Sequence, residues 1–222
     1  MKYSVAFDLD GTLIDLPVDI ESARAEIAAL FAGHGYQEPM RPILEAINRA
    51  AASVAVNDAD IFPLIIKARN ILDVAEVEAS KKATPRPGAL KAIERLQKLG
   101  VSMGIVTNNS RACIAPALAV LGSRPQNFAI STRDDVRRPK PAPDGLIRIA
   151  SVVGERGEDM WYIGDSPVDV SAAVAANHQV APTLRAIAVK GPRSSLQQLQ
   201  MAGPCIVLTT LDEAIDRIVK GA

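Results

Sequence analysis

The sequence predicts an α/β protein in which a parallel sheet is covered by helices and an all-helical domain is inserted. From about residue 84 to the end, short apolar runs alternate with helical patterns, which is typical of strands in a parallel sheet. Residues 16–83 interrupt this alternation and contain no convincing strand. The composition is 48% hydrophobic but only 4% aromatic, so the core must be mostly Ala, Val, Ile and Leu. Together these observations favour a Rossmann-like sheet with a helical insertion.

The expected strands are apolar runs of four to seven residues that are rich in Val, Ile or aromatic side chains. They cover residues 3–7, 101–107, 128–132, 160–164, 186–189 and 205–208. The best helical pattern between them is 87–99, where apolar residues recur three apart and Gly100 can end the helix. The last helix is expected to open at Thr210, because Glu213 follows at capping-box spacing.

The interrupting segment is expected to form a separate domain. Residues 16–83 suggest three helices, at about 18–32, 40–56 and 60–82, with turn residues between them. The predicted division is therefore a catalytic core of residues 1–15 and 84–222 with a helical cap of residues 16–83.

The charge pattern argues against several partners. Lys plus Arg and Asp plus Glu number 25 each, so an extended basic surface for nucleic acid is not expected. Cys113 and Cys205 are far apart and form neither a metal-ligand spacing nor a disulfide framework, as expected in a reducing compartment. No stretch approaches the ~20 apolar residues that span a bilayer, and the first residues do not resemble a signal peptide. A cytoplasmic protein without a membrane partner is therefore expected.

Two carboxylates follow the first predicted strand, in Asp8-Leu9-Asp10-Gly11-Thr12. Side chains two apart on a strand point the same way, so both acids are expected to face one site. They lie at the carboxyl end of a strand, where open α/β sheets bind ligands. Their repulsion invites a cation or a shared proton, and Gly11 lets the backbone approach a ligand. The alternative is an acidic turn without function, since Asp-Gly is a common turn pair.

Polar groups also follow the next strands. Thr107 and Asn108 end the second strand, where a hydroxyl and an amide can bind phosphate oxygens. Lys140 lies among three alternating prolines, which hold it on a stiff extended segment and pre-order a cation for a phosphoryl group. Alternatively, Ser110 or Asn109 simply caps the next helix, and Lys140 is a solvated lysine on a surface loop.

A second pair of acids follows the strand at 160–164. Asp165 lies on the turn after this buried strand, while Ser166 and Pro167 predict a helix start. Asp169, three residues after Ser166, has a second interpretation as the acidic half of a capping box.

In this order and spacing, the sequence resembles the haloacid dehalogenase superfamily of phosphotransferases. The resemblance rests on Asp8-Leu9-Asp10-Gly11-Thr12, then Thr107, then Lys140, then Gly164-Asp165 with Asp169, and covers nearly the whole chain. The helical segment between the first two motifs resembles the helical cap of phosphoglycolate-phosphatase-like members.

The resemblance implies roles for these residues. Asp8 would be the nucleophile and Asp10 the general acid and base. Thr107, Asn108, Lys140 and Gly11 would contact the substrate phosphate. Mg²⁺ would be held by Asp8, Asp165 and the main-chain carbonyl of Asp10, and Asp169 would orient Lys140 or a water of the ion. An acid at the Asp10 position favours phosphate chemistry over dehalogenation, in which no alkoxide needs a proton.

The expected function is hydrolysis of a small phosphorylated metabolite by a monomer or homodimer. A phosphosugar mutase, which uses the same residues, is the alternative enzyme. A phosphonate-cleaving hydrolase would need a lysine early in the cap, and residues 16–66 contain none. A non-catalytic module of the same fold would be expected to have lost some of the motif residues, yet all are present.

Overall fold

The computed structural model describes residues 3–54, 58–122, 125–153, 159–177, 179, 183–203 and 205–221, without the side chains of 58–60 and 125. The chain divides into two compact units. The core unit comprises Met1–Leu16 and Ala83–Ala222, and the helical unit comprises Pro17–Lys82.

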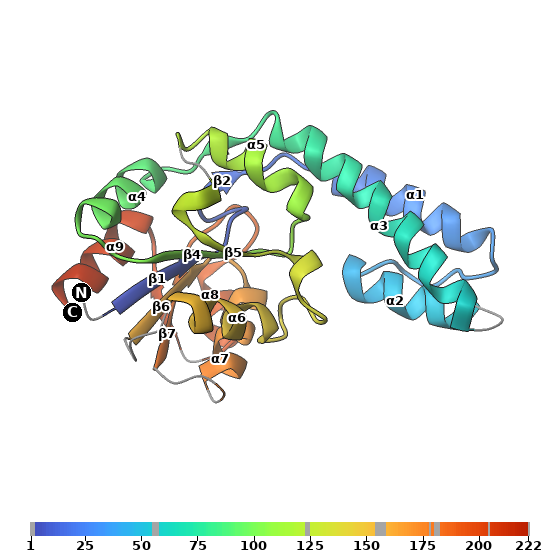
Figure 1. Ribbon diagram of the computed structural model, residues 1–222. Coiled ribbons are helices and arrows are strands. Elements are labelled where there is room, and N and C mark those ends of the chain that lie inside the picture. The colour runs from blue at the N-terminus through green and yellow to red at the C-terminus, as the bar shows by residue number, and fades with distance from the viewer. Residues whose placement is uncertain are drawn as a thin grey trace. The chain divides into compact units, whose positions relative to one another are not determined.

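The core unit is built on a six-stranded parallel sheet. Its strands are β1 (Tyr3–Phe7), β4 (Met103–Val106), β5 (Ala129–Ser131), β6 (Asp159–Gly164), β7 (Leu184–Val189) and β8 (Ile206–Leu208). Their order is β5-β4-β1-β6-β7-β8 (Figure 1). The chain therefore runs outward from β1 through β4 to β5 and then returns to β6 on the other side of β1. Connections diverge above β1 and β6, and this is where an open α/β sheet forms a ligand crevice at its carboxyl edge.

Helices cover both faces of the sheet. In the described residues of the core unit these are α4 (Ala89–Lys98), α5 (Ile114–Ala119), α6 (Asp144–Val153), α7 (Pro167–Asn177), α8 (Leu196–Met201) and α9 (Leu211–Lys220). Helices α6 and α7 pack against each other on one side, and α4 and α9 pack together on the other (Figure 1). Short 3₁₀ turns lie at Arg111–Cys113, Pro125–Asn127 and Arg133–Asp135.

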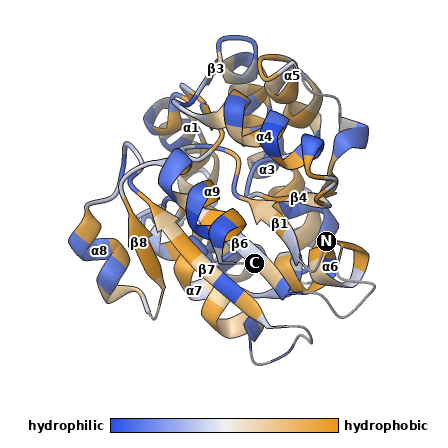
Figure 2. Cartoon of the chain, turned by 90° about the vertical axis from the view of Figure 1, so that its left-hand side faces the viewer, coloured by the Kyte–Doolittle hydropathy of each residue, from blue (hydrophilic) through white to orange (hydrophobic). Residues whose placement is uncertain are grey.

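Burial on both faces explains the continuous apolar runs in the central strands. All five residues of β1 are buried, as are the last five of β6. Figure 2 shows these strands largely in hydrophobic colours, whereas α9 alternates between hydrophilic and hydrophobic residues. This amphipathic helix opens with the predicted capping box, in which the Thr210 hydroxyl accepts a hydrogen bond from the Glu213 N–H.

The helical unit has its own core. It contains α1 (Ile20–Ala32), α2 (Ile43–Val54) and α3 (Asp58–Ser80), and α3 packs against both other helices. Fully buried side chains such as Ile27, Phe31 and Ile47 fill the space between them. No helix in the described ranges combines the length and the apolar character needed to cross a membrane.

A small antiparallel pair connects the two segments of the core unit that border the helical unit. Strand β2 (Ile14–Asp15) pairs with β3 (Thr84–Pro85), and Gly11, with a φ of 91°, makes the left-handed turn that precedes it. The sequence did not predict this pair, because strands of two residues show no periodicity. The predicted fold class is confirmed, and the six predicted strands agree with the observed ones within two residues at each end.

Candidate active site at the carboxyl ends of the strands

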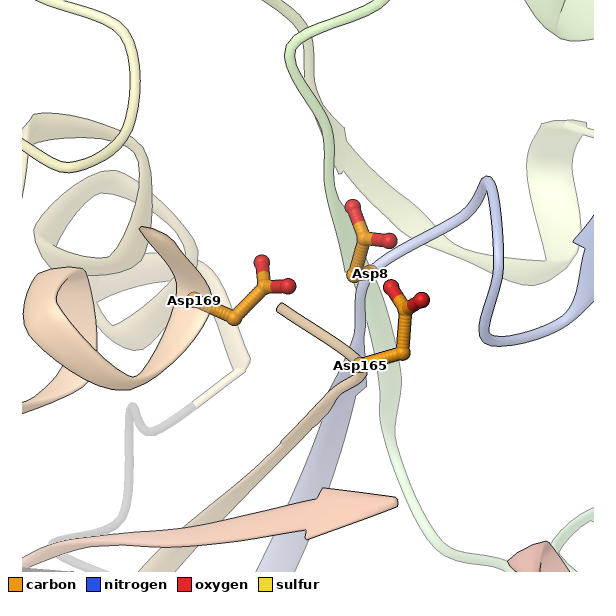
Figure 3. Close-up of side chains that lie close together, drawn as sticks. All are labelled: Asp8, Asp165 and Asp169. Carbon is orange, nitrogen blue, oxygen red and sulfur yellow. The ribbon is translucent and has the colours of Figure 1, made fainter. Parts of the chain in front are cut away.

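Three aspartates meet at the topological switch point. Asp8 follows β1, Asp165 follows β6, and Asp169 lies in the first turn of α7 and directs its carboxylate toward the other two (Figure 3). All three are buried, and one oxygen of each lies within 4.8 Å of the others. The strand order therefore brings Asp8 together with two acids that lie more than 150 residues later in the sequence.

A buried lysine holds two of these carboxylates. The Nζ of Lys140 donates hydrogen bonds to Asp8 Oδ1 and to Asp169 Oδ1, both at 2.6 Å. It also contacts the Val106 carbonyl and the Tyr162 hydroxyl at 3.0 Å each. Four oxygen atoms therefore surround the ammonium, and they come from β4, β6, α7 and the residue that follows β1.

The loop that carries Lys140 is held by Asn108. The side-chain amide of Asn108 donates to the Lys140 carbonyl at 2.8 Å, and its side-chain oxygen accepts from the Lys140 N–H at 2.9 Å. The Thr107 hydroxyl donates to Asn109 Oδ1 at 2.7 Å and accepts from the Asn109 N–H at 3.1 Å. Asn108 therefore positions Lys140 in this structure, and the expected contacts of Thr107 and Asn108 with a phosphate remain predictions.

Asp169 contacts both the start of α7 and Lys140. Its Oδ2 accepts a hydrogen bond from the Ser166 N–H at 3.0 Å, and the Ser166 hydroxyl accepts one from the Asp169 N–H at 3.3 Å, which is the geometry of a capping box. The Ser166 hydroxyl also donates to Asp169 Oδ2 at 2.6 Å. Its Oδ1 accepts from Lys140 and, at 2.7 Å, from the Tyr162 hydroxyl. The helix cap and the lysine contact use different oxygens of one carboxylate.

Burial raises the pKa values of two of the three aspartates, Asp8 and Asp165. Burial raises the pKa of Asp8 well above its ordinary value, and although Lys140 opposes this, Asp169 and Asp165 add to it. Burial, with the charges of Asp169 and Asp10, raises the pKa of Asp165 to about 7.

Asp169 and Lys140 are held in their charged forms. Burial disfavours the ionised Asp169, but Lys140 and the hydrogen bonds from Ser166 and Tyr162 keep its pKa below the ordinary value. Burial likewise opposes the charge of Lys140, and the adjacent Asp169 and Asp8 outweigh it and raise the lysine pKa. One ammonium therefore faces three carboxylic groups, and ionisation of all three would leave negative charge that a bound cation could neutralise.

Glycines make room for the acidic side chains. A Cβ on Gly11 would lie 2.3 Å from Asp165 Oδ2, and a Cβ on Gly191 would lie 1.7 Å from the same oxygen. A Cβ on Gly164 would lie 2.4 Å from the Cβ of Asp169. Only glycine fits these positions without moving the carboxylates.

Asp10 is held differently from Asp8. It lies beyond the end of β1, in the turn at Gly11, so the two-residue alternation of a strand does not fix its direction. Its Oδ1 accepts from the Leu16 N–H at 3.0 Å, and its Oδ2 accepts from Arg193 Nη1 at 2.6 Å. Burial raises the pKa of Asp10 above the ordinary value, although Arg193 opposes this. Asp10 is not among the three clustered carboxylates, so only its main-chain carbonyl remains a predicted metal ligand.

Oxygen donors of this kind fit a hard cation. Asp8 and Asp165 supply carboxylates that burial has made costly to ionise, and the Asp165 carboxylate packs directly against Gly11 and Gly191. In the described part of the chain, no hydrogen-bond donor contacts the Asp165 carboxylate. Asp169 is less available as a ligand for a cation, because both of its carboxylate oxygens already accept hydrogen bonds.

Three residues of the site, Tyr162, Gly191 and Arg193, were not predicted from the sequence. Tyr162 was part of an apolar run and gave no separate sign of a polar role. Gly191 and Arg193 come after the predicted strand 186–189, so the rule that ligands gather at the carboxyl ends of parallel strands would have indicated them.

The doubly wound sheet and its buried acids at the switch point define the class as an α/β enzyme for a charged ligand. A family model of haloacid dehalogenase-like hydrolases matches residues 4–177. The chain belongs to this family, as its motifs indicated.

Curated relatives agree with this assignment. A phosphoglycolate phosphatase from Salmonella typhi is 29% identical over 194 residues, covering 78% of this chain and 77% of the relative. A validoxylamine A 7'-phosphate phosphatase from Streptomyces hygroscopicus subsp. limoneus is 31% identical over 183 residues, covering 78% and 82%. A solved hydrolase structure from Pseudomonas syringae has the same fold, with a TM-score of 0.70 at 23% identity and 99% coverage of both chains. The predicted enzyme class, a phosphatase, is confirmed by these matches.

The Tyr162 hydroxyl predicts a measurable share of stability. Tyr162→Phe removes a buried donor to Asp169 and a neighbour of Lys140, so we expect the free energy of unfolding in urea to fall by about 1–2 kcal/mol. Tyr36→Phe is the matched control, because the buried Tyr36 hydroxyl has no hydrogen-bond partner in the described residues. The control should be neutral or stabilising. Equal losses in both variants would contradict this account of the network.

Proposed function

We propose that this chain hydrolyses a small-molecule phosphate monoester in a Mg²⁺-dependent reaction, through an aspartyl-phosphate on Asp8. The observation that carries this proposal is the position of the Asp8 carboxylate, which lies at the end of β1, is hydrogen bonded to Lys140 at 2.6 Å and adjoins Asp165. A fixed carboxylate beside a cation, at the crevice of an α/β sheet, is suited to attack a phosphoryl group.

In the first step, a carboxylate oxygen of Asp8 attacks phosphorus and the bond from phosphorus to the ester oxygen breaks. Protonated Asp10 gives its proton to the departing alcohol oxygen. Both Asp10 oxygens accept hydrogen bonds in this structure, from the Leu16 N–H and from Arg193, so the oxygen that carries the proton either shares it with one of these contacts or loses that contact.

In the second step, water attacks the phosphorus of the aspartyl-phosphate. Asp10, now ionised, takes a proton from this water, and the bond between Asp8 and phosphorus breaks to release inorganic phosphate. Both steps move negative charge onto the phosphoryl oxygens. The Lys140 ammonium and the donors of Thr107 and Asn108 are proposed to stabilise that charge. Gly11 is proposed to contact the phosphate as well, but its N–H donates to the Ile14 carbonyl at 2.7 Å in this structure and would first have to leave it.

Mg²⁺ would be held by the carboxylates of Asp8 and Asp165 and by the main-chain carbonyl of Asp10. When bound, the ion neutralises charge on the phosphoryl oxygens. Asp169 would act indirectly, because its contacts with Lys140 and Ser166 fix the ammonium and the start of α7.

A small phosphorylated metabolite is proposed as the substrate, because the curated relatives are phosphatases of small phosphate esters by name. The same relatives favour hydrolysis over the return of the phosphoryl group that a mutase performs. The use of the helical unit as a cap remains a prediction.

Asp8→Asn tests the nucleophile. The amide cannot form the acyl-phosphate, so we expect phosphate release from small esters to fall to the limit of detection. Asp19→Asn is the matched control, since Asp19 caps α1 and asparagine caps helices equally well. Turnover by Asp8→Asn within about tenfold of wild type, a barrier change of about 1.4 kcal/mol, would rule out the nucleophile role.

Removal of divalent cations tests the metal. Chelation should abolish phosphate release and added Mg²⁺ should restore it, while Mg²⁺ should also raise the melting temperature of the wild-type chain. Asp165→Ala should abolish or strongly weaken this thermal shift, because it removes a ligand. Full activity in excess chelator, or an unchanged shift in Asp165→Ala, would contradict the site.

Asp10→Asn tests the proton donor. A good leaving group needs little protonation, so kcat/KM should fall by roughly 100-fold or more for an alkyl phosphate and much less for p-nitrophenyl phosphate. Equal losses on the two esters would show that Asp10 does not act as the general acid.

A further inference from the structure

The loop after β7 brings an arginine to the site that the motifs do not contain. Residues 190–193 read Lys-Gly-Pro-Arg and come after β7 (Leu184–Val189) at the carboxyl edge of the sheet. Gly191 lies against the Asp165 carboxylate, so this loop forms part of the site wall. Arg193 projects from the same wall.

Arg193 is tied to the site but keeps unused donors. Its Nη1 pairs with Asp10 Oδ2 at 2.6 Å, and its Nη2 lies 3.4 Å from the Leu16 carbonyl. A guanidinium has five N–H donors in a planar fork. Within the described ranges the Arg193 Nε has no hydrogen-bond partner, and the side chain is 60% exposed against 13% for Asp10.

Two other cations near these acids, Lys140 and Arg86, are already paired. The Lys140 side chain is only 5% exposed and is shared by Asp8 and Asp169. Arg86 pairs with Asp15 at 3.1 Å and donates to the Lys190 carbonyl. In the described part of this site, Arg193 is therefore the cation best placed to meet a group arriving from solvent.

The position of Arg193 relative to a substrate depends on Asp10, and this step rests on the proposed function. A general acid must lie within hydrogen-bond distance of the oxygen that it protonates. The leaving oxygen of the ester would then be close to Asp10, and the guanidinium that contacts Asp10 would be close to the substituents of the leaving alcohol.

We propose that Arg193 determines specificity by binding a carboxylate on the leaving alcohol of the substrate. Carboxylates match the planar fork of arginine, which can hold them through two parallel hydrogen bonds. Without this cation, a carboxylate arriving beside Asp10 and Asp165 would meet like charges. The substrate class is therefore a phosphate ester of a short hydroxy acid.

A pair of isosteric substrates tests this assignment. We expect wild-type kcat/KM for 2-phosphoglycolate to exceed that for its neutral amide by about tenfold or more, as a charge-assisted pair implies. Arg193→Met should reduce this ratio to below about threefold, mainly through loss on the carboxylate. A disturbance of Asp10 would change kcat/KM for both esters equally. A change in the ratio of the two kcat/KM values therefore reports the contact between Arg193 and the substrate carboxylate.

Two further variants sharpen the result. Arg185→Met is the matched control, since Arg185 forms an exposed pair with Asp159 on the neighbouring strand and should leave the ratio unchanged. Arg193→Lys keeps the charge without the fork, so its ratio should fall between those of wild type and Arg193→Met.

Other outcomes separate this inference from the proposed function. A wild-type ratio near one, or a ratio that survives Arg193→Met, would overturn the role of Arg193 while hydrolysis still stands. Failure of the wild-type chain to release phosphate from any small ester would overturn the proposed function, and this inference with it.

Discussion

The site depends on one buried ammonium between two carboxylates. Lys140 reaches Asp8 and Asp169 at 2.6 Å each, and all three side chains are almost completely buried. Transfer of such charges from water is costly, so the arrangement persists only because each group has partners. Removal of one partner would leave a buried charge uncompensated, with a cost on the order of 3–5 kcal/mol. Lys140 also connects the end of β1 to the start of α7, so the same contacts stabilise the fold and position the site residues.

The same buried charges that are costly for stability also favour binding of a cation and a phosphoryl group. The single ammonium cannot balance Asp8, Asp165 and Asp169, and burial raises the pKa of Asp8 and of Asp165. Such a cluster favours binding of a cation, and positive charge next to these acids would stabilise a bound phosphoryl group. The strand order explains why the acids meet, since β1 and β6 are neighbours at the point where the connections diverge.

Regular patterns in the sequence predicted the elements that carry the site. Buried strands produce apolar runs, so β1 and β6 were located with the acids at their ends, and Thr210 and Glu213 indicated the capping box of α9. The features that the sequence could not predict depend on tertiary contacts. The β2–β3 pair is too short for a pattern, and the direction of Asp10 depends on a left-handed turn at Gly11 and on a partner 183 residues away. The hydrogen bonds of Tyr162 could not be predicted, because a tyrosine within an apolar strand is usually interpreted as a packing residue.

The most direct test is to trap the phosphoryl group on Asp8. Asp10→Asn should still be phosphorylated by an activated aryl phosphate but should hydrolyse the aspartyl-phosphate slowly. Acid quenching during turnover, followed by peptide mass spectrometry, should then find the phosphoryl group on the peptide that contains Asp8. Stoichiometric release of phosphate with no adduct, or an adduct on another residue, would contradict the central role of Asp8.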